Sequence, residues 1–265
     1  MPTATLLPPD SVLDALRGDR AARPARDTTS AATYRATLEQ RIGDVLVGVP
    51  ADTRVVLTAA SLRRSAQTRD LHDSTRGRLR GALVSVLLRL HVVGTPLGSA
   101  FDDALTAWCA EGPSLELLTH WESLDDDERA RLATDVTAHH VTLARALGEV
   151  PDEWSARTAQ RASLRLAGGR VVLRDTVDLV IGSVHADVAG VVLFDVTTSP
   201  LGDGAERALR YHALVETLRT SVVPLRSAVF SSATGELWLR EVDSDMLARA
   251  VDEVVAAVSE ECGPR

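Results

Sequence analysis

RDTVDLVIG at residues 174–182 and VVLFDVTTSP at residues 191–200 are the two stretches that decide the expected fold. Both are apolar runs rich in β-branched side chains, which is typical of buried strands. Asp178 lies late in the strand expected in the first run, and Asp195 lies late in the strand expected in the second. Aspartate is rarely buried unless it is paired or bound to a cation. We therefore expect the two strands to be neighbours and the two carboxylates to converge.

The sequence around these stretches predicts an α/β unit. Gly168-Gly169 separates two strand-like segments and predicts a hairpin. The elements expected after residue 200 are a helix over 206–220, strands over 225–231 and 236–242, and a last helix from Ser244. Because strand–helix–strand connections in one sheet are right-handed crossovers, residues 191–231 predict a pair of parallel strands.

The first half of the chain is predicted to be helical. In residues 76–93 apolar side chains recur at i, i+3, i+4 and i+7, and Gly94 stands where a helix cap belongs. Other helices are expected over 31–45, 99–109, 114–121 and 125–147, with one short strand over 54–58. The expected division is a flexible N-terminal arm over 1–30, a helical region over 31–150 and an α/β core over 151–265.

All 29 basic residues are arginine, and the chain contains no lysine. A GC-rich genome, which favours arginine codons, is a sufficient cause. P-loop NTPases, protein kinases and Schiff-base enzymes each rely on a lysine amine, so this composition argues against all three. Arginine cannot replace lysine in proton transfer, because its pKa lies above 12.

Charge and hydropathy narrow the expected setting of the protein. The formal net charge is −8, which counts mildly against a nucleic-acid binder. No apolar run approaches the roughly 20 residues needed to span a bilayer, so we expect no membrane association and a cytoplasmic location. Two distant cysteines, Cys109 and Cys262, argue against a disulfide framework or a zinc knuckle.

Three motifs in order resemble the PD-(D/E)XK nuclease superfamily, in particular its RecB-type exonuclease branch. That family has a strand ending in GxxD, a strand ending in (D/E)xK and a helix with a QxxxY-like signature. RDTVDLVIG resembles the first motif with Asp178 at its acid, and FDVTTSP resembles the second with Asp195 at its acid. RALRYHALVETLR resembles the helix, with Arg207 and Tyr211 at the QxxxY spacing. The resemblance covers about residues 154–258 and implies a restriction-endonuclease-like core, an α/β fold with a mixed β-sheet flanked by helices.

The sequence departs from the family pattern at motif positions, including one that takes part in catalysis in the family. The glycine of GxxD is Asp175, and the lysine of (D/E)xK is Thr197. The nearest candidates for a residue that the family carries on an early helix are Ser85 and His91. In the family, the lysine orients the attacking water and stabilises the charge that develops at phosphorus. In a lysine-free chain, only Arg207, at the glutamine position, or nearby Arg210 could supply such a charge.

The two aspartates define the expected centre. Two convergent carboxylates with a backbone carbonyl suit Mg²⁺ or Mn²⁺. The resemblance implies that Asp178 and Asp195 hold a weakly bound Mg²⁺, with Thr197 at the third catalytic position. The alternative interpretation is structural, with each aspartate capped or paired with an arginine such as Arg174 or Arg210.

A cluster of arginines is the candidate nucleic-acid-binding surface. Six arginines lie between Arg63 and Arg80, including Arg64, Arg69, Arg76 and Arg78. If they lie beside the aspartates, Arg63, Arg64, Arg76 and Arg80, with Arg207 and Arg210, could hold phosphates. The alternative is a solvated surface in a protein whose cations are all arginine.

These observations leave three hypotheses for function. The leading one is a catalytically impaired homologue of the PD-(D/E)XK nucleases that keeps a nucleic-acid-binding or partner-binding role. The second is an active Mg²⁺-dependent nuclease with an atypical centre. The third is a protein–protein interaction module that binds no nucleic acid.

Overall fold

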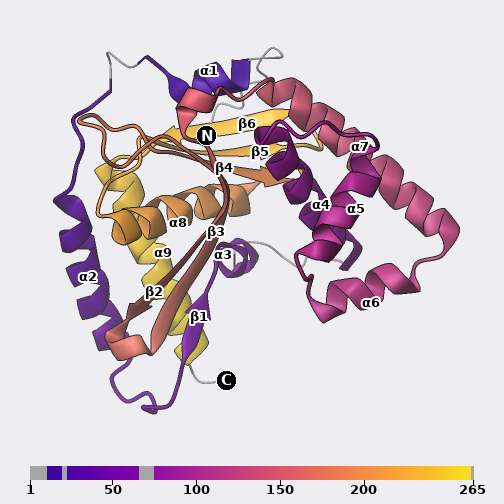
Figure 1. The fold of residues 1–265 in the computed structure, drawn as a ribbon. Helices are drawn as coiled ribbons and strands as arrows, with labels where there is room; N and C mark the ends of the chain where they lie inside the picture. The colour runs from indigo at the N-terminus through magenta and orange to yellow at the C-terminus, as the bar shows by residue number, and fades with distance from the viewer. Residues whose placement is uncertain (1–10, 20–22, 66–74, 264–265) are drawn as a thin grey trace.

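The computed structural model describes residues 11–19, 23–65 and 75–263. Within these ranges the protein has an α/β fold in which helices flank a mixed six-stranded sheet, as the sequence predicted (Figure 1). The strands are β1 (Val55–Leu57), β2 (Arg157–Leu166), β3 (Val171–Ile181), β4 (Val192–Thr197), β5 (Arg226–Ser231) and β6 (Glu236–Glu241). The α-helices are α1 (Ser11–Arg17), α2 (Ser30–Val45), α3 (Ala59–Ser65), α4 (Thr75–Val92), α5 (Ala100–Ala110), α6 (Leu115–Ser123), α7 (Asp126–Leu147), α8 (Asp203–Thr220) and α9 (Ser244–Cys262).

Strand β3 organises the sheet. It pairs in parallel with β1 and antiparallel with both β2 and β4. Strand β5 is parallel to β4 and antiparallel to β6. The parallel pair β4–β5, joined through α8, confirms the predicted crossover. The predicted hairpin is also confirmed, since Gly168 and Gly169 lie in the turn between β2 and β3.

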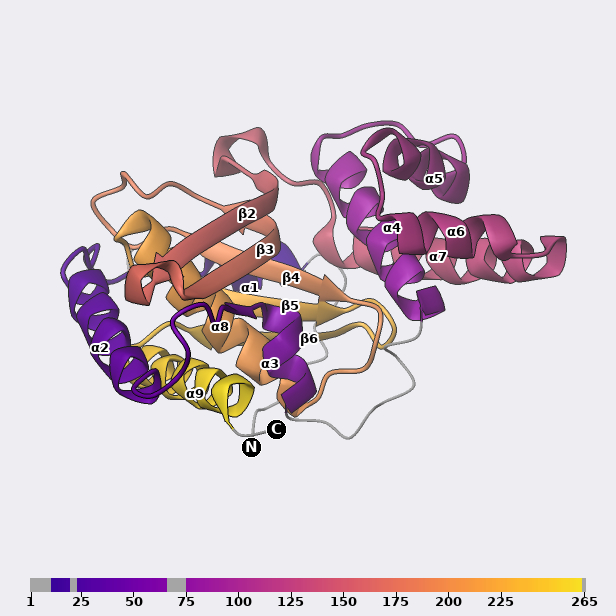
Figure 2. The ribbon, with the colours of Figure 1, turned by 90° about the horizontal axis from the view of Figure 1, so that it is seen from below.

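Two cores lie on the two sides of the sheet. Helices α2, α8 and α9 cover one side (Figures 1 and 2), where Leu38, Leu214 and Val254 are fully or almost fully buried. Helices α1, α4 and α7 contribute to the other core, in which Leu16 and Leu88 are fully buried. Burying apolar side chains on both sides of the sheet is the main stabilising contribution to this fold.

Helix α4 belongs to two cores at once. Its Val84 and Leu88 belong to the core that α1, α4 and α7 form against the sheet, while Leu83 and Leu87 face α5 and α7. Trp108 of α5 is buried in the same core as Leu83 and Leu87. Helices α4 to α7 therefore form a lobe beside the sheet, and α4 and α7 connect this lobe to the sheet (Figures 1 and 2).

Side chains at helix N-termini determine where several helices begin. Ser99, Ser114 and Asp243 each accept a backbone N–H from the first turn of α5, α6 and α9. At α7, Asp125 and Glu128 form a reciprocal capping box. Such caps satisfy donors that have no partner within the helix, and each contributes about 1 kcal/mol.

Two glycines allow close approaches that position the site. Gly182 ends β3 with φ of 92°, and a Cβ atom there would lie 2.0 Å from the carbonyl oxygen of Gly190. Gly204 begins α8, and a Cβ atom there would lie 3.3 Å from the carbonyl oxygen of Arg63. The missing side chain at Gly204 therefore lets α3 pack closely against α8, and this brings Arg63 near β4.

Several elements pack across the expected boundaries at residues 30 and 150. The division of the chain at these residues stays a prediction. Helix α1 lies within the expected arm, yet its Val12 and Leu16 are buried in the core that α1, α4 and α7 form against the sheet. Strand β1 and helix α2 lie within the expected helical region, yet both pack with the sheet unit. In the described ranges, no helix has the length and hydrophobicity required to cross a bilayer.

Candidate functional site: the carboxylate network

The register of β3 and β4 brings Asp178 and Asp195 together. In these antiparallel strands, Leu179 lies opposite Phe194. One residue further along, the same register places Asp178 opposite Asp195, and their two carboxyl groups share a hydrogen bond. The structure thus places the two sequence-predicted acids side by side, as expected.

Asp178 is the protonated member of the pair at neutral pH. Its Oδ1 accepts a hydrogen bond of 2.9 Å from Ser85 Oγ on α4, and its Oδ2 accepts one of 2.9 Å from the Val196 N–H. Burial, followed by the neighbouring charge of Asp195, raises the pKa of Asp178 to about 8. Opposite Asp178, the β2–β3 ladder is interrupted at Ala159, which has φ of 49°.

Asp195 is the ionised member. Its Oδ2 lies 2.6 Å from a guanidinium nitrogen of Arg63, on α3. Burial alone would raise the pKa of Asp195, but the close approach and charge of His212, together with the charge of Arg63, hold that pKa well below its usual range. The pair therefore divides into one neutral and one charged carboxyl group, as expected when two acids lie close together.

His212 of α8 connects Asp195 to a third acid, Asp175. The His212 Nδ1 atom lies 2.9 and 2.8 Å from the two carboxylate oxygens of Asp175. Its Nε2 atom lies 3.5 Å from Asp195 Oδ2, which is longer than an ordinary hydrogen bond. The His212 and Asp175 side chains are only 2% and 3% exposed. Burial opposes protonation, but the charge and hydrogen bond of Asp175 raise the pKa of His212 to about 10, so it is a cation at neutral pH.

We call this set the carboxylate network. Its members are Arg63, Ser85, Asp175, Asp178, Asp195 and His212. Two cations face three carboxyl groups, one of which holds a proton. The network is therefore close to electrically balanced by its own side chains. A buried group of this kind is stable only while each charge keeps its partner.

Sequence reasoning found part of this network. It identified Asp178 and Asp195 from their apolar surroundings and named Ser85 as a candidate on the early helix. It noted Asp175 only as a departure from the motif and did not include His212 among the candidate site residues. The available signal was the pairing of two unusual features, an acid at a glycine position and a histidine inside an apolar helix face, because each needs a buried partner.

Arg210, one of the two expected cationic substitutes for lysine, has its acceptors elsewhere. Arg210 binds Glu253 through two guanidinium nitrogens and also lies 3.6 Å from Glu206. These contacts hold it on the α9 side of α8, and Arg63 supplies the charge at Asp195 instead. The alternative interpretation, in which an aspartate pairs with an arginine, describes Asp195, but its partner is Arg63 and not Arg174 or Arg210. Arg207 lies half-buried on α8.

Thr197, at the lysine position, is used by the local backbone. Its Oγ1 accepts a hydrogen bond from the Ser199 N–H, and its carbonyl oxygen accepts two from Ser232, one of them through the Ser232 hydroxyl. The Ser232 hydroxyl also contacts His139 Nδ1 at 2.9 Å. Thr197 is thus part of a half-buried turn that fixes the end of β4.

The arginines before and within α4 have acceptors inside the protein. Besides Arg63, Arg76 lies 3.2 Å from Asp135 and Arg78 lies 2.6 Å from Glu116. Arg80 donates to the carbonyl oxygen of Thr198 at 3.3 Å. The side chain of Arg64 and all of Arg69 fall outside the described residues. The members that are described form separate internal contacts and not one open basic strip.

The carboxylate network as arranged does not fit a bound Mg²⁺ ion. In the described part of the chain, no group of three or more His, Cys, Asp or Glu side chains is arranged to hold a metal. Both oxygens of Asp178 already accept hydrogen bonds, and the Arg63 guanidinium lies 2.6 Å from Asp195 Oδ2. A divalent ion here would be repelled by two neighbouring cations, Arg63 and His212.

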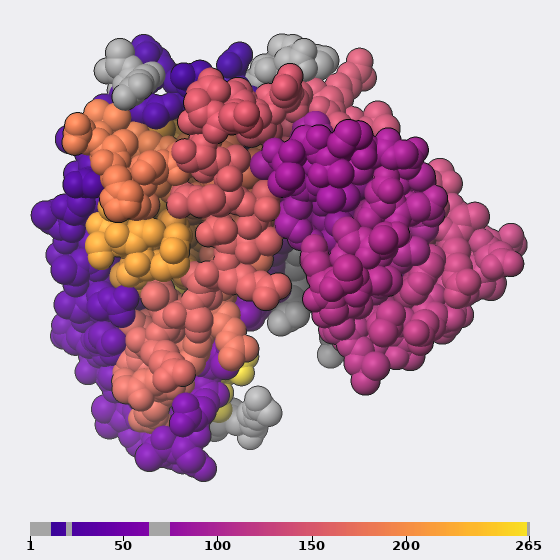
Figure 3. Space-filling view, in the orientation of Figure 1, coloured from indigo at the N-terminus to yellow at the C-terminus, as the bar shows by residue number. Residues whose placement is uncertain are grey.

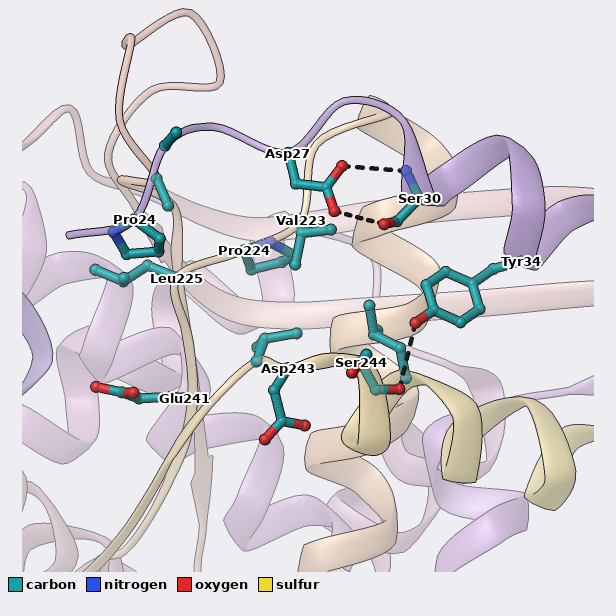
Figure 4. Close-up of a pocket in the computed structure, with 14 residues that line it drawn as sticks. Pro24, Asp27, Ser30, Tyr34, Val223, Pro224, Leu225, Glu241, Asp243 and Ser244 are labelled. Carbon is teal, nitrogen blue, oxygen red and sulfur yellow. Dashed lines mark hydrogen bonds between the residues drawn. The ribbon is translucent and has the colours of Figure 1, made fainter.

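A separate hollow of about 370 Å³ lies between the N-terminal segment and α9 (Figure 4). Its polar groups serve local structure. Asp27 accepts hydrogen bonds from Ser30 at the start of α2, Asp243 caps α9, and the Tyr34 hydroxyl donates to the Ser244 carbonyl oxygen at 3.3 Å. These contacts account for its polar side chains through the packing of α2 on α9.

Comparisons with known proteins identify no family. No protein-family model matches the chain, and no curated protein matches it. Among solved structures, the crystal structure of SSO0001 is similar, with 10% sequence identity, a TM-score of 0.33 and coverage of 88% of each chain. A likeness at this level carries no argument about function.

Proposed function

We propose that this chain is a homologue of the PD-(D/E)XK nucleases that binds nucleic acid without cleaving it. One observation carries the proposal: the guanidinium of Arg63 lies 2.6 Å from Asp195, at the centre where the family would hold its metal. The three resembling motifs and the arrangement of β3, β4, α8 and β5 support the relationship. The loss of lysine and the internal neutralisation of the acids support the absence of cleavage.

The chemistry of the remaining groups argues against turnover. A phosphoryl-transfer transition state needs positive charge directed at phosphorus and a group that orients the attacking water. Thr197 offers a neutral hydroxyl that already accepts a backbone hydrogen bond. Arg63 offers charge, but its guanidinium cannot exchange a proton and is engaged with Asp195. The role left to such a protein is binding, through surfaces outside the network.

A cleavage assay tests this proposal. Labelled single-stranded and double-stranded DNA and RNA would be incubated with purified protein and Mg²⁺ or Mn²⁺, then separated on a denaturing gel. We expect no cleavage above that of an Asp195→Ala control prepared in the same way. Cleavage by the unaltered protein that disappears in Asp195→Ala would contradict the proposal and favour an active metal-dependent nuclease with an atypical centre.

A designed gain of function provides the complementary test. In Arg63→Ala/Thr197→Lys, the internal cation is removed and the missing lysine is restored. We expect this double variant to gain metal-dependent cleavage that Thr197→Lys alone does not show, because Arg63 would still occupy the acids. Equal cleavage by both variants would mean that Arg63 does not block the centre.

A further inference from the structure

An exposed, arginine-rich surface lies on the β2–β3 hairpin, away from the carboxylate network. Side chains alternate between the two sides of a strand, so Arg161 and Arg165 of β2 share a side with Arg174 of β3. The register agrees, since Arg174 is opposite Ser163 and Arg165 is opposite Val172. All three arginines are exposed. We call this surface the hairpin face.

Strand β1 widens the hairpin face. Val56 is paired with Val172 and is 47% exposed, although it lies in a sheet strand. Arg54, just before β1, lines the same surface hollow of about 590 Å³ as Arg165 and Arg174. Helices α8 and α9 cover one side of β2 and β3. The opposite side, which carries the hairpin arginines, has no described helix drawn over it along the hairpin (Figure 2). Figure 3 shows the surface around the hairpin, next to the hollow that separates the sheet from the α4–α7 lobe.

The charge on the hairpin face has no counterpart inside the described part of the protein. Arg161, Arg165 and Arg174 form no ion pair with any described carboxylate, whereas the α4 residues Arg76 and Arg78 each do. The hollow on this face has no acidic residue in its lining, which includes the Gly168-Gly169 turn. On a chain with a net charge of −8, this concentration of unpaired cations is a local exception.

These features fit a ligand that carries several phosphates in a row. Guanidinium groups bind phosphate oxygens with paired hydrogen bonds, and they remain charged at every accessible pH. Residues two apart on a strand are about 7 Å apart, and neighbouring strands are about 5 Å apart, so the arginines form a spaced array and not a single pocket. The face offers no aromatic side chain for stacking on bases, which leaves contacts to the backbone.

We propose that the hairpin face binds the phosphate backbone of nucleic acid. The proposal rests on the binding role proposed above and names the surface that performs it. Contacts to phosphates carry no base sequence, so binding is sequence-independent and weakens steeply as salt increases. The overall negative charge of the protein repels nucleic acid elsewhere, which directs binding to this face.

The test compares two triple variants that remove equal charge. Arg161→Ala/Arg165→Ala/Arg174→Ala removes the hairpin arginines, and Arg76→Ala/Arg78→Ala/Arg89→Ala removes three arginines that are ion-paired on α4. Fluorescence anisotropy with labelled oligonucleotides is measured at several salt concentrations, and thermal melts verify that both variants are folded. We expect at least about tenfold weaker binding at low salt for the hairpin variant, and a slope of log K against log salt reduced by about 3. The α4 variant should stay within about twofold of the unaltered protein, because its arginines are already neutralised.

Each contrary result overturns a specific claim. Undetectable binding to every oligonucleotide at low salt, or binding that survives in the hairpin variant, contradicts the hairpin-face proposal. An equal loss in both triple variants contradicts it as well, because charge alone would then explain binding. Tighter binding to a polyglutamate peptide or to anionic lipid vesicles than to oligonucleotides would replace nucleic acid as the ligand. The same samples are run on a denaturing gel, where cleavage would contradict only the non-cleaving role.

Discussion

The carboxylate network and the hairpin face use arginine in opposite ways. In the network, Arg63 lies against Asp195, and His212 lies between two buried acids, so the charges are neutralised internally. On the hairpin face, Arg161, Arg165 and Arg174 project from one side of a sheet without a described carboxylate partner. The difference teaches that one protein can use arginine both to neutralise buried carboxyl groups and to leave positive charge open on a surface.

The largest expected effect is the removal of His212. His212→Ala leaves Asp175 and Asp195 buried without their shared cation, and losing one partner of a buried ion pair costs about 3–5 kcal/mol. Urea unfolding at neutral pH measures the change in the free energy of unfolding. Arg41→Ala, which breaks the exposed pair with Asp252, is the control and should cost at most about 1 kcal/mol. A cost for His212→Ala no greater than for Arg41→Ala would contradict the framework role.

The pH dependence of stability is expected to be the next largest effect. The pKa of Asp178 is raised to about 8 and that of His212 to about 10, so both bind protons more tightly in the folded state. Their contribution is full below the unfolded pKa and is lost as the pH rises through the folded pKa. The pKa of Asp195 is lowered, so its contribution is lost in acid. We expect stability to be greatest near pH 4, to fall above that pH as the contribution of Asp178 is lost, and to fall more steeply above about pH 6.5, where the contribution of His212 is lost as well, by several kcal/mol in all by pH 9.

Asp178→Asn is the variant that sharpens this pH prediction. An amide imitates the protonated carboxyl group, so it can keep a hydrogen bond to Asp195 without ionising. We expect a shallower loss of stability between about pH 4 and 8, and a variant at least as stable as the unaltered protein at pH 9. Chemical unfolding across this pH range measures both quantities. A variant with the same pH slope as the unaltered protein would mean that Asp178 is already ionised at neutral pH.

A smaller effect is expected from the hydrogen bond of Ser85. Ser85→Ala removes the donor to Asp178 Oδ1 and should reduce the free energy of unfolding by about 1 kcal/mol. Ser163→Ala, on the exposed hairpin face, is the matched substitution and should change stability by less than about 0.5 kcal/mol. Equal effects of the two substitutions would remove Ser85 from the network.

The smallest expected effect on stability comes from the hairpin arginines. Arg161→Ala/Arg165→Ala/Arg174→Ala removes three exposed side chains without breaking a described ion pair, so we expect a change within about 0.5 kcal/mol for each substitution. Thermal unfolding of the triple variant checks this expectation. A stabilised variant would fit relief of repulsion among the arginines, while a loss of several kcal/mol would show that the face supports the fold.

The fold was predictable from local patterns because its signals lie within short segments. Apolar runs defined the strands around Asp178 and Asp195, and Gly168-Gly169 defined the hairpin. The network was only partly predictable, because its cation comes from a distant segment: Arg63 is separated from Asp195 by 132 positions in the sequence. No local rule specifies that α3 approaches β4.

The hairpin face and the α4 arginines show that open surface charge was also hard to predict from the sequence. The α4 arginines were conspicuous because they are dense in the sequence, yet their carboxylate partners, Glu116 and Asp135, come from other helices. Arg161, Arg165 and Arg174 are spread over two strands, so their common side is visible only once the β2–β3 register is known. Charge density along a chain is therefore a poor guide to open charge on a surface.

The most direct test of the central claim is a calorimetric titration of Mg²⁺ and Mn²⁺ into the unaltered protein and into Arg63→Ala. If the protein's own cations occupy the place of a metal, the unaltered protein shows no saturable binding at millimolar metal. Arg63→Ala then gains a site, and the additional substitution Asp195→Asn abolishes it. Saturable binding by the unaltered protein that Asp195→Asn removes would contradict the claim and indicate that the carboxylate network is still a metal centre.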